Sequence, residues 1–237
     1  MVARESTIRT LHELRSRFGT TKTLKHAAFR LINRFVHFDC LDIIALRREH
    51  LQPLDPSGTR RLSAKIATLD DLKEMERQGC WEIQERKIEF FHQGDTCLLS
   101  YVDNELAGYT WAHTRGCPEI VPGLRLSIPL EYLYNFAAFT LPAYRGWGLQ
   151  SFRHHALLEG DLWKDKKGLL GFVIHTNYRS QRGQRKSGYE KIGSIWLIGG
   201  KSRFGAWVGK SLRSMGIQRI RSASRERRPR SLLPVGG

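Results

Sequence analysis

The chain has 237 residues, 41% of them hydrophobic, so it can bury the core of one sizeable domain with appendages. No apolar run approaches the roughly 18 residues of a membrane span, and the first residues lack the apolar segment of a signal peptide. This composition excludes a membrane-spanning protein and predicts a soluble, cytoplasmic one.

The formal net charge is +16, and most of it lies at the two ends of the chain. Residues 201–230 hold ten lysines and arginines against one acidic residue, and residues 1–50 hold ten against five. Such ends suit a nucleic acid, an anionic membrane or an acidic substrate, or they keep the protein soluble. Charge alone leaves these alternatives open.

The cysteines predict neither a disulfide framework nor a metal site. They show no Cys-x-x-Cys pair and no histidine at metal-ligand spacing, and they are Cys40, Cys80, Cys97 and Cys117. Reduced thiols in a cytoplasmic protein are therefore expected, and no metal.

The N-terminal stretch, residues 7–38, has apolar residues at helical spacing with a break at residues 19–21, which predicts two amphipathic helices. Their arginine-rich polar faces suit a membrane-surface or partner-docking hairpin, or a pair of helices packed on the main domain. The second interpretation is favoured because His26, Asn33 and His37 interrupt the apolar face.

Residues 40–46 are a candidate extra strand. The loop 52–58 predicts a boundary between an extension, 1–52, and a domain, 60–210.

The first half of that domain reads as strand 62–67, helices 70–77 and 81–92, and a hairpin of strands 96–102 and 105–113. Thr68 supplies an N-cap for the first helix, and Asp103-Asn104 supplies the turn of the hairpin. Residues 115–129, with three prolines and two glycines, predict a loop that frames a binding site.

The second half is organised around a glycine turn. A strand at 131–141, apolar enough to be buried on both faces, leads into the turn at 144–150 and a helix to residue 163. Strand 169–175, helix 177–186 and a hairpin of 189–198 and 203–208 follow, and residues 211–237 predict a basic, disordered tail.

Two glycines in this turn, Gly146 and Gly148, stand where a helix begins. Without a Cβ, the backbone N–H groups there can converge on an anion, since the first donors of a helix are unpaired. Gly-x-Gly turns also close ordinary strand-to-helix junctions, so the turn alone leaves both readings open.

Two sequence elements resemble the GNAT superfamily of coenzyme A-dependent N-acyltransferases. Residues 140–150 read TLPAYRGWGLQ, beside the family pattern V-x-P-x-[YF]-[RQ]-x-x-G-x-[GA]. Asn177 follows the next strand, and Gly188-Tyr189 ends the next helix, as in the family. The resemblance covers about residues 62–208 and implies an α/β fold with a mixed, centrally splayed sheet flanked by helices, here with an N-terminal helical extension.

The resemblance also implies a ligand and its site. The implied donor is acetyl-coenzyme A, or coenzyme A with another acyl group, and the implied acceptor is an amine of a small molecule or amino sugar. Backbone amides near the turn would hold the pyrophosphate, the strand end before it the thioester carbonyl, and Asn177 the pantetheine arm. The implied cofactor-binding residues are Phe139, Thr140, Leu141, Arg145, Gly146, Trp147, Gly148, Leu149, Gln150 and Asn177.

Two residues depart from the family pattern. Gln150 stands where the family keeps a glycine or alanine, and Gln184 stands where many members have a tyrosine that protonates the leaving thiolate. A glutamine cannot donate a proton in that role, so another group or water must replace it.

The catalytic candidates are Glu131, as general base, and Tyr134. Strand alternation places Glu131, Asn135 and Phe139 on one face and Tyr134 and Phe136 on the other. The alternative is that Glu131 is a solvated strand-end residue and the tyrosines belong to the core. The lone histidines His92, His113 and His175 are interpreted as structural, and adjacent helix positions keep His154 and His155 from forming a joint site.

A non-enzymatic alternative remains. The chain could be a coenzyme A-binding module without chemistry, whose basic ends bind a nucleic acid or an anionic membrane. The basic residues from 213 to 230 have no aromatic residues between them, which argues against a platform for stacking bases. A long acyl chain in place of acetyl would need an apolar channel near Phe136 and Phe139.

Overall fold

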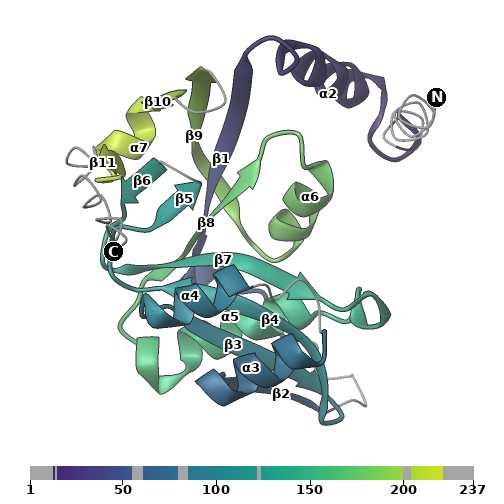
Figure 1. The fold of residues 1–237 in the computed structure, drawn as a ribbon, viewed down its shortest axis with the longest axis vertical. Helices are drawn as coiled ribbons and strands as arrows, with labels where there is room; N and C mark the ends of the chain where they lie inside the picture. The colour runs from purple at the N-terminus through teal and green to yellow at the C-terminus, as the bar shows by residue number, and fades with distance from the viewer. Residues whose placement is uncertain are drawn as a thin grey trace, which may run out of the picture.

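Eight strands form one mixed sheet in the computed structural model of the protein, which describes residues 13, 15–54, 61–79, 85–121, 124–199 and 204–220 (Figure 1). In sheet order they are β10 (Phe204–Val208), β9 (Glu190–Gly199), β1 (His37–Arg47), β8 (Gly168–Ile174), β7 (Tyr132–Thr140), β4 (Glu105–His113), β3 (Thr96–Val102) and β2 (Leu62–Ile66). β7 and β8 pair in parallel, and the other neighbours pair antiparallel. The expected mixed α/β sheet is confirmed.

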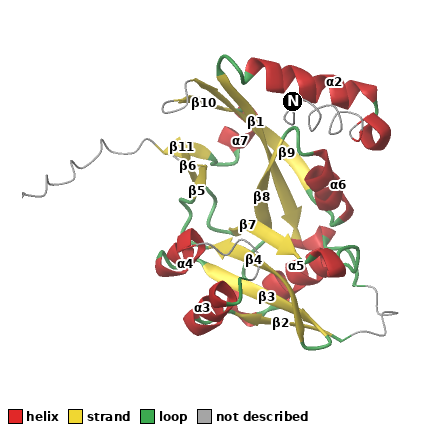
Figure 2. Ribbon diagram, turned by 45° about the vertical axis from the view of Figure 1, so that its right-hand side comes forward, coloured by secondary structure: helices red, strands yellow, loops and turns green. Residues whose placement is uncertain are grey.

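Helices cover both faces of this sheet. Figure 2 shows α5 (Leu149–Glu159) and α6 (Tyr178–Lys186) on one side, and α3 (Leu69–Arg77) and α4 (Glu85–His92) on the other. A small sheet of β5 (Glu119–Val121), β6 (Leu124–Ser127) and β11 (Gln218–Ile220) lies on the side of α3 and α4, next to α7 (Lys210–Ser214). Single turns of 3-10 helix lie at Arg48–His50, Pro142–Tyr144 and Asp161–Trp163.

Two local predictions are confirmed in detail. The Thr68 hydroxyl accepts from the backbone N–H of Asp71, whose carboxylate accepts in return from the Thr68 N–H, so α3 begins with a capping box. Asp103 and Asn104 take positive φ values of 50° and 71°, as the tight turn between β3 and β4 requires.

The strand β1 differs most from its predicted place. Residues 1–52 were expected to be a helical extension, yet β1 lies in the middle of the sheet, where it pairs with both β8 and β9. Leu41, Ile43 and Ala45 pack toward the small sheet, whereas Ile44 and Leu46 pack toward α5. The candidate strand at 40–46 is therefore confirmed, and the sheet includes residues on both sides of the expected boundary.

The helical part of the extension is α2 (Thr20–Ile32), preceded by helical residues 15–18. α2 contacts the body through the ring of Phe29, which lies 5.1 Å from that of Phe38, and through the Lys22 carbonyl oxygen, which accepts from the Tyr178 hydroxyl at 3.1 Å. It buries no residue of its own. Leu24, Leu31 and Phe35 are exposed. Most of the first predicted helix lies outside the described residues. Within the described part of the chain, no helix is long and apolar enough to cross a membrane.

Two expected irregular segments contain regular structure. The predicted loop 115–129 includes β5 and β6, and the predicted tail begins with α7 and with β11, which pairs with β6. The rest of that tail, residues 221–237, lies outside the described residues, as does the start of the helix expected at 81–92.

The strand β7 contains a bulge that overturns the simple alternation. Ala137 has φ +46°, and the register with β4 shifts so that Tyr109 faces Phe139 while Trp111 faces Phe136. Phe136 and Phe139 therefore pack into one cluster instead of on opposite faces. The second half of β7 is only partly covered, with exposed Ala137 and Ala138, instead of buried on both faces.

Candidate functional site

The parallel pair β7–β8 opens into a split. Its register covers Tyr132 to Tyr134 against Gly168 to Leu170 and ends there. β7 then continues along β4 to Thr140, while β8 continues along β1 to Ile174. Beyond Tyr134 the facing edges of these two strands have no pairing with each other, so an extended ligand can add its own hydrogen bonds there.

The glycine turn lies at the end of β7. Gly146 has φ +89°, and Gly148 has φ +73° and is the N-cap of α5. A Cβ built on either glycine would meet nothing within 4 Å, so the space in front of the turn is open. No side chain caps this helix end. The helix end at the predicted anion site is therefore uncapped and open, and the binding of an anion by its N–H groups stays a prediction.

The side chains of the turn pack against the rest of the protein and hold the turn in place. The ring of Trp147 packs edge-on against Tyr144, 5.3 Å between centroids, and Leu149 is 2% exposed in the same apolar cluster. Arg145 Nε donates to the Thr140 carbonyl oxygen at 3.2 Å, and its guanidinium lies 6.0 Å from the Phe139 ring centroid. Trp147 and Leu149 can thus reach a ligand through their backbone, while Arg145 braces the turn on β7.

The two residues that depart from the family pattern contact each other. Gln150 Nε2 donates to Gln184 Oε1 at 2.8 Å, which joins the start of α5 to the middle of α6. A glycine or alanine at 150 has no side-chain N–H and could not donate this bond. The two departures are therefore one structural feature.

A buried arginine holds the end of β7. Arg153, on α5, is 2% exposed and donates to the hydroxyls of Ser100 on β3, at 3.0 Å, and Thr140 on β7, at 2.9 Å. Burial lowers its pKa to about 10, so it stays charged at neutral pH. Leu141 N–H donates to the Ala107 carbonyl, which fixes the last residue before the turn to β4.

The other side of the split ends at Asn177. Its side-chain oxygen caps α6 by accepting from Ser180 N–H at 3.1 Å. This leaves the amide NH₂ as the part of the side chain that can donate to a ligand. The structure thus places Asn177 directly after β8, across the split from the turn.

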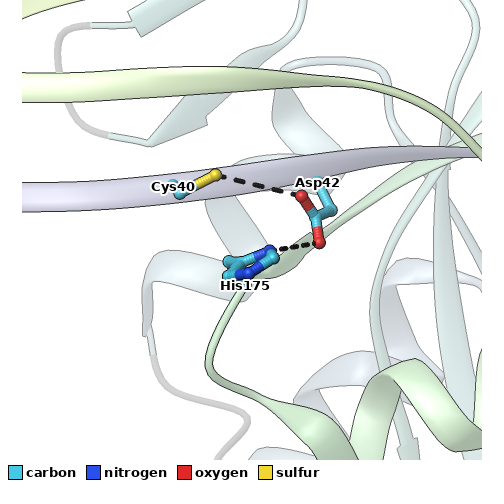
Figure 3. Close-up of side chains that lie close together, drawn as sticks. All are labelled: Cys40, Asp42 and His175. Atoms are coloured by element: carbon cyan, nitrogen blue, oxygen red, sulfur yellow. Dashed lines mark hydrogen bonds and ion pairs between the residues drawn. The ribbon is translucent and has the colours of Figure 1, made fainter. Parts of the chain in front are cut away.

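An ion cluster anchors the end of β8 (Figure 3). The buried Asp42 accepts from Lys191 Nζ at 2.7 Å, from Ser194 Oγ at 3.0 Å and from His175 Nδ1 at 2.7 Å. Burial opposes the charge on Asp42, but the bonds from Lys191 and His175 outweigh it and lower the pKa of this carboxyl. Burial, with Asp42 nearby, raises the pKa of the Cys40 thiol to about 11, so the thiol stays protonated.

Cys40, Asp42 and His175 place three potential ligand atoms within 4.8 Å of one another. An ammonium group already neutralises the carboxylate at the centre of this group, and a hydroxyl and an imidazole complete its hydrogen bonds. The cluster therefore acts as an ion network that positions the β8 end and the following Asn177.

The two catalytic candidates, Glu131 and Tyr134, lie at different positions relative to the split. Glu131 precedes β7 at the opposite end of the strand from the turn, and its half-exposed carboxylate lies 3.9 Å from Lys167 Nζ. Tyr134 is buried at the point where β7 and β8 separate, and burial, followed by the charge of Asp95, raises its pKa well above the usual value. The structure brings Tyr134, and not Glu131, to the split.

A cavity of about 420 Å³ opens beside the bulge, on the face that carries α4. Its aromatic wall comes from both sides of the split: Tyr134 and Phe136 on β7, and Phe172 on β8. The rings of Tyr134 and Phe172 stack with centroids 6.3 Å apart. The cavity therefore reaches the split from the face opposite α5 and α6.

An acid–base pair of a buried aspartate and a partly buried histidine lines the same cavity. His113 Nδ1 lies 2.5 Å from Asp95 Oδ1, and the two side chains are 14% and 6% exposed. Asp95 immediately precedes β3 and His113 ends β4, so the two residues face each other across the hairpin. The sequence suggested only a structural role for His113 and did not reveal this pair. The pairing depends on a register shift between Ser100 and Tyr101 that has no clear signal in the sequence.

From β2 onward the chain runs as strand, two helices, hairpin, the short strands β5 and β6, split strand, glycine turn, helix, strand, helix and hairpin. Apart from β5 and β6, this is the order that the resemblance to the GNAT superfamily implies. A scan against protein-family models finds no match, and no curated protein is similar in sequence. Solved structures do show similar folds. A GCN5-related N-acetyltransferase from Kribbella flavida is 14% identical, with a TM-score of 0.45, and the match covers 73% of this chain and 63% of that protein.

Two further structures are similar at the same level. A tandem GNAT protein from the clavulanic acid biosynthesis pathway is 17% identical over 73% of this chain and 56% of that one, with a TM-score of 0.46. The aminoglycoside N-acetyltransferase AAC(6')-Iy, in complex with a bisubstrate analogue, is 15% identical over 55% of this chain and 92% of that one, with a TM-score of 0.43. The chain thus spans less than two thirds of the first two proteins.

Proposed function

We propose that the protein is a coenzyme A-dependent N-acyltransferase that moves an acetyl or other acyl group to the amine of a small molecule or amino sugar. The observation that carries this proposal is the split between β7 and β8 with an open glycine turn at its end. A thioester of coenzyme A has both a pyrophosphate for such a turn and a peptide-like arm for such a split.

Residues of this chain would hold the donor from both sides of the split. The N–H groups of residues 146–151 suit the pyrophosphate, and the β7 edge near Thr140 suits the thioester end. The Asn177 amide suits the pantetheine arm. A thioester is already activated, so the chain has mainly to align an amine with it, take one proton from that amine and give one to the leaving thiolate.

Calorimetric titration with acetyl-coenzyme A tests the site through Gly148→Glu and Gly148→Ala. Both variants force a side chain into a left-handed conformation, so they carry a similar backbone strain. The glutamate also adds negative charge at the helix N-terminus, in the open space before it. We expect Gly148→Glu to weaken binding at least about tenfold more than Gly148→Ala does, or by about 1.4 kcal/mol or more.

Thermal melting of both variants serves as the control, because a variant that unfolds cannot report on binding. Equal affinities for the two folded variants would place the phosphates away from this turn. Absence of binding by the unmodified protein at micromolar concentrations would contradict the proposed function itself.

A further inference from the structure

The cavity at the split differs in charge from the rest of the protein. The chain is strongly basic, yet the carboxylates that line the cavity are Glu89, Asp95 and Glu119, against one arginine, Arg125. Arg125 faces Glu119 across the β5–β6 pair, which sets opposite charges against each other. Glu89 and Asp95 therefore give this cavity a local negative potential.

The cavity walls are largely aromatic. Phe90, Tyr134, Phe136 and Phe172 line it, and Phe90 meets Phe136 edge-on with centroids 5.2 Å apart. Aromatic faces beside carboxylates attract a cation that carries an apolar body, and the volume of about 420 Å³ suits a small molecule. An anionic acceptor would meet repulsion from Glu89 and Asp95.

His113 has one ring nitrogen without a partner. A carboxylate can only accept, so Asp95 fixes the proton of the neutral imidazole on Nδ1. Nε2 then carries the lone pair, and within the described part of the chain this buried atom has no hydrogen-bond partner. A buried polar atom in that state is costly, and a ligand in the cavity that His113 lines would relieve the cost.

We propose that His113 is the general base for the acceptor, with Asp95 as its positioning residue, and that the acceptor is a cationic amine with an aromatic or apolar body. This inference rests on the proposed function. An amine that binds as an ammonium first releases one proton to solvent. As its nitrogen then bonds to the thioester carbon, His113 Nε2 takes a second proton, directly or through one water. The C–S bond breaks, its electron pair stays on sulfur, and the thiolate takes from the imidazolium the proton that the amine gave up.

The location supports these roles. The cavity is lined in part by residues of α4. Figure 2 shows α4 on the opposite face of the sheet from α5, whose N-terminus would hold the phosphates. An acyl group that passes between β7 and β8 at the bulge of Ala137 would meet an amine in the cavity. Tyr134, at the branch point, lines the cavity. Burial raises its pKa, so the phenol keeps its proton and does not act as a base.

The test measures thiol release from acetyl-coenzyme A with 2-phenylethylamine and tyramine as probes, for wild type, His113→Asn and His92→Asn. Asparagine at 113 can still donate to Asp95 from the position of Nδ1 but has no base in place of Nε2. We expect His113→Asn to bind acetyl-coenzyme A as wild type does and to lose about 10²- to 10⁴-fold in kcat/KM. His92, on the exposed side of α4, is outside the cavity lining, and its variant should match wild type.

Two readouts separate a catalytic from a structural role. The acidic limb of the wild-type kcat/KM profile should be absent in His113→Asn, and added imidazole should restore part of the activity of His113→Ala. Asp95→Asn should lose less kcat/KM, about 10- to 100-fold, because it leaves His113 Nε2 in place. Should His113→Asn fail to fold, the pH profile of Asp95→Asn and the rescue of His113→Ala decide.

Three results would overturn the inference. One is turnover by His113→Asn within threefold of wild type with an unchanged acidic limb. Another is wild-type protein that binds acetyl-coenzyme A but turns over neither probe. The third is faster turnover of an anionic amine, such as glutamate, than of 2-phenylethylamine. Failure of wild type to bind acetyl-coenzyme A would instead contradict the proposed function, which keeps the two failures distinct.

Discussion

Replacing Gly168 with alanine is expected to destabilise the protein by about 3 kcal/mol or more. A Cβ at this position would lie 2.2 Å from the carbonyl oxygen of Leu46 and 3.0 Å from the Cα of Arg47, both in the backbone of β1. Backbone atoms within a paired strand cannot turn aside as a flexible side chain can, so β1 and β8 would have to separate. Gly168 is also the first residue of β8 to pair with β7, so the strain reaches the base of the split.

Gly205→Ala is the matched control for this change. Gly205 is a glycine of the same sheet, on the edge strand β10, where a Cβ would make an ordinary contact of 3.6 Å with the Ile198 carbonyl oxygen. Urea unfolding should show a free energy of unfolding close to wild type for Gly205→Ala and a large loss for Gly168→Ala. Similar values for the two variants would mean that β1 and β8 do not approach as closely as described.

The second large effect on the free energy of unfolding is expected at His154, and it depends on pH. This residue, on α5, is 2% exposed; its Nε2 lies 3.5 Å from the Tyr189 hydroxyl, and its Nδ1 has no partner within the described residues. Burial, followed by the charge of Arg153, lowers the pKa of His154 to about 3. In the unfolded chain the imidazole takes up a proton at about pH 6.5, so the unfolded state binds more protons between these two values.

The contribution of His154 to stability is therefore complete above about pH 6.5 and falls as the pH falls toward 3. At pH 4.5 the loss should be about 2–3 kcal/mol relative to a variant that cannot titrate there. We expect His154→Gln and His154→Met, compared with wild type by urea unfolding at pH 7.5 and 4.5, to gain that amount at the lower pH. Both replacements are neutral, so this gain should be the same in both even if their stabilities at pH 7.5 differ. A difference from wild type that is equal at both pH values would contradict the buried, neutral imidazole.

Local chemistry could be predicted from sequence where neighbouring residues determine it. The N-cap at Thr68 and the turn at Asp103-Asn104 depend on side chains within a few residues of each other, and both were predicted. The open glycine turn before α5 was predicted for the same reason, since Gly146 and Gly148 adopt conformations that other residues avoid.

Long-range pairing could not be predicted in the same way. The apolar run at 40–46 shows that a strand forms, but the partners of β1 are β8 and β9, more than a hundred residues further along the chain. The bulge at Ala137 has no local signal, because alanine is not a residue that favours φ +46°. It nevertheless decides which side chains of β7 share a face.

The pair of Asp95 and His113 shows how a small irregularity hides a candidate site. A regular hairpin from the turn at Asp103-Asn104 would place Asp95 opposite Ala112. The register shift between Ser100 and Tyr101 moves the pairing by one residue, so Thr96 faces Ala112 and Asp95 comes opposite His113. Side-chain types alone do not reveal that shift. The contact between Gln150 and Gln184 was likewise hidden, because it depends on how α5 and α6 pack.

Amide hydrogen exchange with and without acetyl-coenzyme A tests most directly the central claim that the donor binds at the split. We expect slower exchange in residues 146–152 and along the second half of β7 when the ligand is present, with no change in α3. Exchange that is unchanged at the turn, or protection confined to the basic residues around α2, would contradict it, because the ligand would then bind elsewhere on the molecule.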